Sequence, residues 1–406
     1  MNKKVGRAAL ATMMSLAIGL GVTACSRDYT VAYVYATSAQ GGGVSAYDVD
    51  FQTGSLVQIP GSPFNSTLKN PVLLVVAPNS KNVYIIGGNQ DDQVAQMAIG
   101  TDGKLFGQTT KNITGHAPTA AAIDPSGAFL YVTYTLQNGF TTASPGPGGV
   151  SIFPLGADGT LGTPTNLNVG NNPVAVVASV LNHFVYVVDA DTNASGTGVG
   201  QILGFSQDPT TGALTPVAGT VITTVAGKTV ATGFNAGSIP TAIAEDPTSR
   251  FVYVTDRASN QLFGYIVLGA TSPGSLSPML NGPFNTGLFP VAVTVDPRGK
   301  YLYVANFGAS TVSSYAIDQA SGNPSGVAGT GNAMFGTGPT CVSVEPALGI
   351  YLYTSNRLDG SVSGAQLDPH NGSLKSVQNT PFQASAQLSC VATAANGQHA
   401  SSIVTP

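Results

Sequence analysis

Residues 290–306 read PVAVTVDPRGKYLYVAN, and variants of this stretch recur along the chain. Each variant has a proline, five mostly apolar residues, a turn such as Asp-Pro-Arg-Gly, and a segment that contains Tyr-Val or a close equivalent. The spacings between successive copies are 47, 55, 67, 50 and 49 residues. Such a period is typical of a propeller blade with four strands. The six copies open at Pro71, Pro118, Pro173, Pro240, Pro290 and Pro339.

Each repeat carries four strand signals. The run after the proline is the first, the Tyr-Val segment is the second, and a run such as TVSSYAI is the third. The fourth follows a turn such as TDGKL or ADGTL, where glycine accepts a positive φ without steric cost. Because no segment shows sustained helical periodicity, the sequence predicts an all-β protein.

The first repeat of the chain lacks its front strand. Residues 33–50, YVYATSAQGGGVSAYDVD, align without a gap with residues 301–318, YLYVANFGASTVSSYAID. The missing strand is supplied by the C-terminus, since residues 388–398 align with residues 290–300. We therefore predict a seven-bladed β-propeller over residues 31–406, closed by pairing the C-terminal strand with the N-terminal strands, which leaves no open edge in the ring.

The N-terminus reads as an export signal. Residues 1–24 have a basic start and an uncharged apolar stretch that is short for a membrane span. Val22-Thr23-Ala24-Cys25 resembles a bacterial lipobox, which predicts lipidation of Cys25 and a short tether over residues 25–30. The alternative is a plain signal peptide cleaved nearby. We expect an exported, membrane-anchored lipoprotein at a periplasmic or outer-membrane face, and Ser26 after the cysteine favours the outer membrane.

Charge and composition exclude several classes of function. Removing residues 1–24 changes the formal net charge from −4 to −7, because that segment holds three basic and no acidic residues. A basic face for nucleic acid is therefore not expected. Charged residues are 8% of the chain, well below the roughly 25% of an average protein. We expect a monomer that touches the membrane through its lipid anchor only.

The repeat resembles the bacterial propellers known for their Tyr-Val-Thr-Asn repeats. The pattern Pro-x5-Asp-Pro-x-Gly-x-x-Leu-Tyr-Val-x-Asn, clearest at Pro290 to Asn306, is similar to the seven-bladed lactonase family that includes 6-phosphogluconolactonase and the fungal muconate cycloisomerases. The resemblance covers essentially all of residues 31–404 and implies the fold and a lactonase-type hydrolase. Of the motifs that family enzymes carry, Asn356-Arg357 matches, whereas the Pro-Arg-His and Asn-Glu motifs are missing here.

Propeller topology predicts which face holds a ligand. The turns between first and second strands, and between third and fourth strands, lie on one face, so the remaining loops and the axial mouth lie on the other. The long insertions 136–149, 191–200 and 216–238 fall on this second face, the ligand face. Candidate binding residues there are His116, Asp189, Asp256, Asn306 and Asn356.

Glu245 breaks an apolar column. Five residues after the opening proline the other repeats have Val, Ile or Ala, so a carboxylate here needs a partner or a raised pKa. Glu245 is therefore the candidate general base for attack of water on a lactone, with Arg257 or Arg357 stabilising the oxyanion. The alternative is a glutamate locked to an arginine or to backbone amides between blades. For His116 the alternative is a solvated loop residue.

Two further groups receive structural assignments. Cys341 and Cys390 occupy the same place in adjacent inner strands, where we expect two small buried residues, and a disulfide is the alternative that an oxidising compartment allows. The acidic residues before proline in the turns are expected to stabilise those turns; they are Asp124, Asp246, Asp296 and Glu345.

No cofactor and no metal site are predicted. The chain has no Gly-x-Ser-x-Gly elbow, zinc signature or phosphate loop, and Asp189 with Asp191 is a weak pattern for a cation. Two functions remain open. One is a lactonase-like hydrolase acting on a small lactone at the axial pocket, and the other is a non-catalytic propeller that binds a protein or glycan at the cell envelope.

Overall fold

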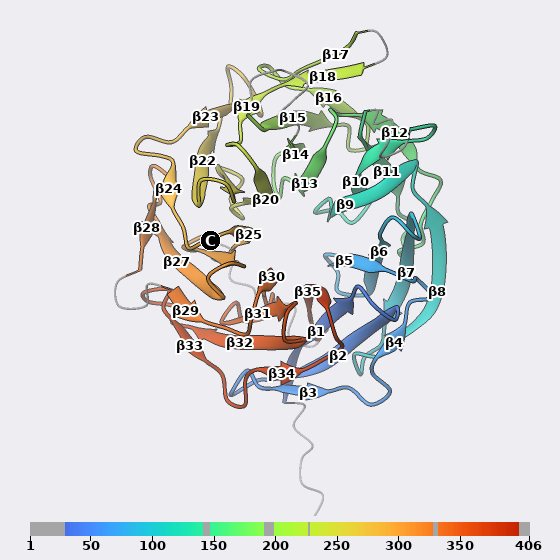
Figure 1. Ribbon diagram of the computed structural model, residues 1–406, viewed down its shortest axis with the longest axis vertical. Helices are drawn as coiled ribbons and strands as arrows, with labels where there is room; N and C mark the ends of the chain where they lie inside the picture. Colours follow the sequence, from blue (N-terminus) through green and yellow to red (C-terminus); the bar gives the residue numbers. More distant parts are fainter. Residues whose placement is uncertain (1–28, 141–146, 191–198, 226–227, 328–331, 398–406) are drawn as a thin grey trace, which may run out of the picture.

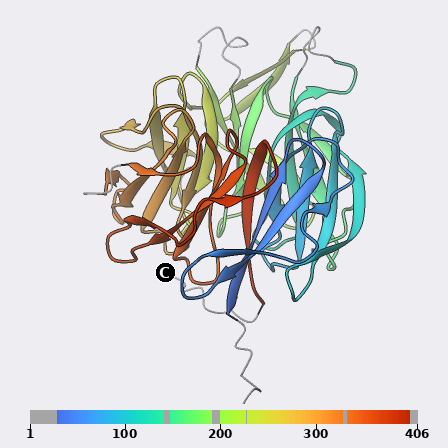
Figure 2. The same ribbon diagram turned by 60° about the horizontal axis from the view of Figure 1, so that its bottom comes forward.

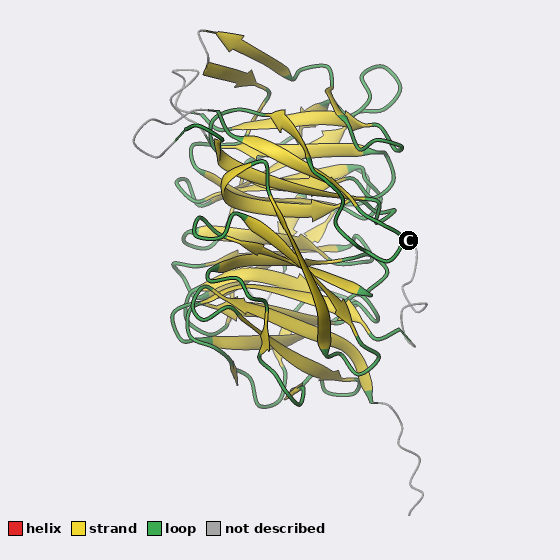
Figure 3. Cartoon of the chain, turned by 90° about the vertical axis from the view of Figure 1, so that its right-hand side faces the viewer, coloured by secondary structure: helices red, strands yellow, loops and turns green. Residues whose placement is uncertain are grey.

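The protein is a closed ring of antiparallel sheets. The computed structural model describes residues 29–140, 147–190, 199–225, 228–327 and 332–397. Seven blades surround a central axis (Figure 1), and the described residues form strands and loops but no helix (Figure 3). Accordingly, no helix in these ranges is long and apolar enough to cross a membrane. The prediction of an all-β, seven-bladed propeller is confirmed.

Six blades follow the six repeats, and each begins with an inner strand at the repeat's proline or just before it. Within a blade the chain moves outward from the axis in the order of the sequence. Blade one contains β5 (Pro71–Val76), β6 (Asn82–Gly87), β7 (Gln93–Ile99) and β8 (Leu105–Asn112); blade two, β9 (Gly115–Ile123), β10 (Phe129–Gln137), β11 (Gly149–Pro154) and β12 (Thr165–Asn168); blade three, β13 (Pro173–Ala178), β14 (Phe184–Asp189), β15 (Gln201–Gln207) and β16 (Leu214–Pro216). Blade four contains β20 (Pro240–Glu245), β21 (Phe251–Asp256), β22 (Gln261–Val267) and β23 (Leu276–Pro278); blade five, β25 (Pro290–Val295), β26 (Tyr301–Asn306), β27 (Thr311–Ile317) and β28 (Pro324–Gly326); blade six, β30 (Pro339–Val344), β31 (Tyr351–Asn356), β32 (Ser361–Leu367) and β33 (Leu374–Ser376).

The seventh blade joins the two ends of the chain. Its order is β3 (Leu56–Gln58), β2 (Gly43–Asp50), β1 (Thr30–Ser38) and β35 (Leu388–Ala395). Figure 2 shows the blue N-terminal strands beside the red C-terminal strand. The register places Tyr33 opposite Ala394 and Thr37 opposite Cys390. The predicted closure is therefore confirmed, and β35 is the missing front strand.

The outer edge of most blades is made of two short pieces. In five blades a further short strand pairs with the part of the third strand that the fourth strand leaves unpaired. These strands are β4 (Phe64–Asn65), β19 (Phe234–Asn235), β24 (Phe284–Asn285), β29 (Asn332–Met334) and β34 (Phe382–Gln383). Blade three also carries a separate hairpin, β17 (Val221–Val225) and β18 (Lys228–Thr232), which projects from the rim at the top of Figure 3.

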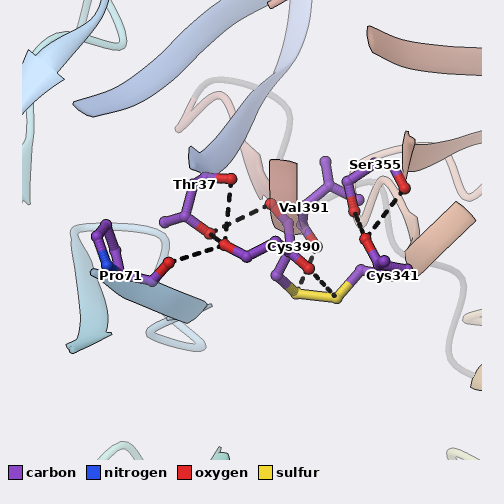
Figure 4. Close-up of a disulfide and its surroundings, with 8 residues drawn as sticks. Thr37, Pro71, Cys341, Ser355, Cys390 and Val391 are labelled. Carbon is purple, nitrogen blue, oxygen red and sulfur yellow. Dashed lines mark hydrogen bonds between the residues drawn. A yellow bond between two sulfur atoms is a disulfide. The ribbon is translucent and has the colours of Figure 1, made fainter. Parts of the chain in front are cut away.

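A disulfide links the closing blade to blade six. Cys341 in β30 and Cys390 in β35 are bonded, with their Cα atoms 5.0 Å apart (Figure 4). The expectation of two unbonded small residues was wrong, because adjacent inner strands converge at the axis and bring these positions within bonding range. In the chain-entropy model, a cross-link over 49 residues of separation stabilises the fold by about 4 kcal/mol.

Hydroxyl groups add a second link between inner strands. Thr119 donates to the carbonyl of Pro173, and Thr241 donates to the carbonyl of Pro290. In the closing blade, the Ser389 hydroxyl donates to the carbonyl of Pro71 in blade one. The closing blade is therefore linked to blade one by this bond and to blade six by the disulfide. These bonds tie the start of one inner strand to the start of the next around the axis.

A ring of tyrosines joins every blade to the next. The third residue of each second strand is a buried tyrosine, except in the closing blade, where a longer strand places it sixth. Each hydroxyl donates to the carbonyl of a glycine in the third-to-fourth turn of the following blade, at 2.6–3.2 Å. The pairs are Tyr35–Gly103, Tyr84–Gly159, Tyr131–Gly212, Tyr186–Gly274, Tyr253–Gly322, Tyr303–Gly372 and Tyr353–Gly54. We call this ring the tyrosine–glycine seam.

The glycines of the seam satisfy two constraints at once. All seven have a positive φ, between 67° and 87°, which disfavours any residue with a Cβ. A Cβ on Gly322, for example, would lie 2.5 Å from the Phe251 ring, because the side chain two residues before each tyrosine packs on the glycine. The seam thus requires a tyrosine in one blade and a glycine turn in the next, and in six of the seven blades the side chain that packs on the glycine is also aromatic, with Asn82 in blade one as the exception.

We expect Gly322→Ala to lower the free energy of unfolding by about 2–4 kcal/mol, from the left-handed backbone and the clash with Phe251. The matched control is Gly326→Ala in the same blade, where a Cβ would meet open space at ordinary φ. That control should change stability by less than about 0.5 kcal/mol. Urea denaturation of both variants measures the difference, and equal stabilities would contradict the role of the seam.

Candidate functional site

The second strands end on one face, as predicted. Asp189, Asp256, Asn306 and Asn356 are the last residues of β14, β21, β26 and β31. His116 lies on the same face in β9, two residues before Pro118. This ligand face is opposite the one that carries the turns of the tyrosine–glycine seam.

The two aspartates of this set are used by the chain itself. Asp256 is 1% exposed and accepts hydrogen bonds from the backbone amides of Ser238, Ile239 and Ala258. These bonds, with one from the Ser259 hydroxyl, hold the pKa of Asp256 below its usual value, although burial opposes the shift. Asp189 accepts the amides of the loop that enters β13 in the same way. Both carboxylates therefore anchor the loops that lead into the inner strands.

The two asparagines are buried more deeply. The Asn356 amide donates to the hydroxyls of Ser361 and Ser363 and accepts from Thr354. Asn306 donates to Thr311 and Ser313 of the third strand. Both are 0% exposed. The predicted binding residues of this column are thus engaged by the chain itself, the aspartates with loop amides and the asparagines with hydroxyls of their own blades, and contact with a ligand stays a prediction.

Glu245 lies at the other end of its blade from the arginines. The register of β20 and β21 pairs Pro240 with Asp256, whereas Glu245 pairs with Val252 near the first-to-second turn. Arg257 follows Asp256, so β20 separates it from Glu245, and Arg357 occupies the corresponding place in blade six. The structure therefore does not bring Glu245 together with Arg257 or Arg357, as the predicted arrangement around one substrate required.

The Glu245 carboxylate completes a turn of the neighbouring blade. It accepts hydrogen bonds from the Ser179 hydroxyl at 2.7 Å, the Val180 amide at 2.9 Å and the Ser249 hydroxyl at 3.1 Å. Blades two, four, five and six cap their own turns with Asp124, Asp246, Asp296 and Glu345, as predicted from the sequence. Blade three has Ser179 at that position, and Glu245 supplies the carboxylate from blade four.

Burial dominates the electrostatics of Glu245. The residue is 8% exposed, and desolvation raises its pKa from 4.5 to about 7 despite the three hydrogen bonds that oppose the shift. Glu245 thus has a raised pKa and two hydrogen-bond partners, Ser179 and Val180, in the neighbouring blade. This site lies on the face opposite the ligand face.

His116 is paired with an aspartate from the preceding blade. Its Nδ1 lies 2.7 Å from Asp92 Oδ2, and the Ala117 amide donates to Asp92 Oδ1 at 2.9 Å. Sequence reasoning missed Asp92, which lies in the loop between β6 and β7. The imidazole is half exposed, and its Nδ1 is held by the Asp92 carboxylate. This geometry orients a histidine for proton transfer.

The arginines stand at the surface of the ligand face. Arg257 lies over the Phe289 ring, with its guanidinium carbon 5.2 Å from the ring centroid. Arg357 is exposed and is followed by the exposed Leu358. Within the ranges that the structure describes, neither guanidinium forms an ion pair. The predicted lipidation site Cys25 and the cation candidate Asp191 lie outside the described residues.

Comparisons with known proteins agree with the fold. The model of a family described as seven-bladed β-propeller lactonase matches residues 30–167 and 200–344. A structure of a putative 6-phosphogluconolactonase from Bacteroides uniformis has a TM-score of 0.70 at 17% identity and covers 90% of this chain and 99% of its own. The periplasmic gluconolactonase of Pseudomonas aeruginosa has a TM-score of 0.67 at 18% identity, with the same coverage. None of the curated proteins matches the sequence significantly.

The structural role of Glu245 predicts a pH dependence of stability. Because the folded pKa is raised, the proton is bound more tightly in the folded state, so the stabilising contribution is present below the unfolded pKa of 4.5 and is lost as pH rises through about 7. The shift corresponds to a loss on the order of 3 kcal/mol. The Glu245→Gln variant should lack this loss of stability. Glu345, the other glutamate, is present in both the wild type and the variant, so its effect on stability cancels in the difference between them.

Urea denaturation of the wild type and of Glu245→Gln near pH 4 and near pH 8 measures this effect. The stability of the wild type relative to the variant should fall as the pH rises. A difference between the two proteins that does not change with pH would contradict the assignment.

Proposed function

The chain belongs to the seven-bladed β-propeller lactonase family, and from this membership we propose that it hydrolyses a small lactone at the ligand face. The observation that carries the proposal is the family match, which spans both halves of the ring. The proteins with similar structures are a putative 6-phosphogluconolactonase and a periplasmic gluconolactonase, and both names refer to lactone chemistry.

The pair Asp92–His116 is the group best placed to act as the base in this reaction. Hydrolysis requires that a water lose a proton as its oxygen bonds to the lactone carbonyl carbon, and that the ring oxygen gain a proton as the ring C–O bond breaks. His116 Nε2 accepts the first proton and returns it to the ring oxygen, so the histidine is regenerated. Asp92 holds Nδ1 and stabilises the imidazolium in between. Glu245 takes no part in these steps.

We also propose export to an oxidising compartment with attachment through Cys25. The Cys341–Cys390 disulfide supports export, because such bonds persist outside the reducing cytosol. Thr30, which opens β1, lies at the face of the first-to-second turns, where its carbonyl accepts a hydrogen bond from Asn396. An anchor five residues earlier reaches about 17 Å from there. That face would then be turned toward the membrane and the ligand face away from it.

The second candidate function is non-catalytic binding at the cell envelope by a monomeric propeller. The observation that favours it is the group of exposed apolar side chains beside Arg257 and Arg357, which hydrolysis of a small lactone does not require.

We expect His116→Ala to lower kcat for lactone hydrolysis by about 10²–10⁴-fold, because general-base catalysis is lost. Asp92→Asn keeps an oxygen for the Ala117 amide and should give a smaller loss, while Glu245→Gln should leave the rate unchanged. Titration of the carboxylic acid released from sugar and aliphatic γ- and δ-lactones measures the rates. Turnover that is absent in the wild type, or unchanged in His116→Ala, would overturn the proposal.

A further inference from the structure

Exposed apolar side chains gather on one sector of the ligand face. Leu288 is 58% exposed, Phe289 38% and Leu358 64%, and the half-buried Phe307 lies between them. The four residues come from blades five and six and form what we call the apolar strip. Apolar surface of this kind, on a protein whose other large side chains are mostly buried, marks a contact surface.

Two glycines make the apolar strip continuous. A Cβ on Gly308 would meet Leu288 and Phe289, and a Cβ on Gly338 would meet Phe307 and Leu358. The Phe289 and Phe307 rings are 6.2 Å apart between centroids and tilted by 51°. The strip therefore runs from Leu288 to Leu358 without a larger side chain standing between its members.

Phe289 is held in a strained backbone conformation. Its φ is 60°, in the left-handed region that a bulky residue rarely adopts. The residue at the same place before the inner strand is Ala117 in blade two, Gly338 in blade six and Gln387 in the closing blade, each also with positive φ. An aromatic side chain at a position where glycine would fit at lower cost indicates that the ring itself is used.

Positive charge stands at both ends of the apolar strip. Arg257 covers Phe289, and Arg357 precedes Leu358. Neither arginine forms an ion pair within the described residues: Asp256 is hydrogen-bonded to backbone amides, and Asp359 accepts hydrogen bonds from the Thr337 amide and from Ser361. In a chain of negative net charge, these two arginines select an anionic partner by charge complementarity.

The shape of the strip favours a macromolecule over a small molecule. Small-ligand sites are concave and bury most of the ligand surface, whereas Leu288, Phe289 and Leu358 of the strip are each more than one third exposed. Aromatic residues and arginine are also the residues that contribute most to protein–protein contacts.

We propose that the apolar strip, with Arg257 and Arg357, docks an acidic, extended segment of a partner protein. Apolar side chains of the segment pack on Phe289, Phe307 and Leu358, and its carboxylates pair with the two guanidinium groups. The proposal goes beyond lactone hydrolysis and does not depend on it.

The test uses a fluorescent peptide in which glutamate alternates with leucine and phenylalanine, and a second peptide with lysine in place of glutamate. Fluorescence anisotropy with the full mature chain should show binding of the acidic peptide only. Arg257→Glu and Arg357→Glu should each weaken that binding by about tenfold or more, and the double variant should bind the lysine peptide instead. The matched controls Lys375→Glu and Leu280→Ser, both at exposed positions away from the strip, should bind as the wild type.

Phe289→Gly separates recognition from folding. Glycine removes the strain at φ 60° but also adds unfolded-state entropy and loses the packing of the ring on Phe307, so the melting temperature should change by only a few degrees while peptide affinity falls by about tenfold. An affinity equal to that of the wild type would overturn the recognition role of the ring.

Four other outcomes would overturn the proposal. They are no binding of the acidic peptide at millimolar concentration, equal binding of both peptides, self-association of the wild type that Arg257→Glu abolishes, and attachment to anionic lipid vesicles that the same variant abolishes. None of these assays contains a lactone, so their results and those of the hydrolysis assay are independent.

Discussion

The hydrogen bond from a buried tyrosine to a glycine carbonyl in the next blade is the interaction on which the ring depends. It occurs seven times and returns to its starting blade. Burial raises the pKa of Tyr84 to about 12 and those of the other six tyrosines above their usual value, so the hydroxyls remain donors at physiological pH. Each glycine must also accept a side chain against its backbone, an aromatic ring in six cases and Asn82 in the seventh, so the seam couples the sequence of one blade to that of its neighbour.

Because of this coupling, the two faces of the propeller differ in how tightly their loops are fixed. The turns of the seam face are fixed by tyrosines, by acidic caps and, in blade three, by Glu245. The ligand face is freer, since among the described residues its loop entries are fixed mainly by carboxylates such as Asp189 and Asp256. The groups left accessible there are His116 and the surface around Arg257 and Arg357. Chemistry and recognition can therefore vary on one face without disturbing the contacts that close the ring.

The repeat was sufficient to predict the blades, their number and the pairing of β35 with the N-terminal strands. These features depend on the repeat period and on turn residues, both of which are visible in the sequence. The disulfide was less accessible, since its Cα distance depends on how closely inner strands converge at the axis. Glu245 was detected as an exception, but its role depends on a second exception, Ser179, one blade earlier. A comparison of the fifth and sixth positions after the opening proline across all repeats could have identified Glu245 and Ser179 as a pair.

The partners of His116 and Phe289 could not be predicted for a similar reason. Asp92 reaches His116 from a loop of the preceding blade, and no spacing within one repeat encodes that contact. The left-handed backbone of Phe289 recurs at the position before the inner strand in three other blades, and four different residue types occupy that position with positive φ.

The closure of the ring by the shared blade is the central claim, and removal of β35 tests it most directly. A chain that ends at Ala386 lacks the inner strand of the closing blade, the bond from Ser389 to Pro71 and the disulfide. Thermal denaturation should show that its cooperative transition is lost or shifted down by about five degrees or more relative to the intact chain, since about 4 kcal/mol is lost with the cross-link alone and the pairing of β1 with β35 is lost as well. A truncated chain that melts cooperatively at the temperature of the intact protein would contradict the account.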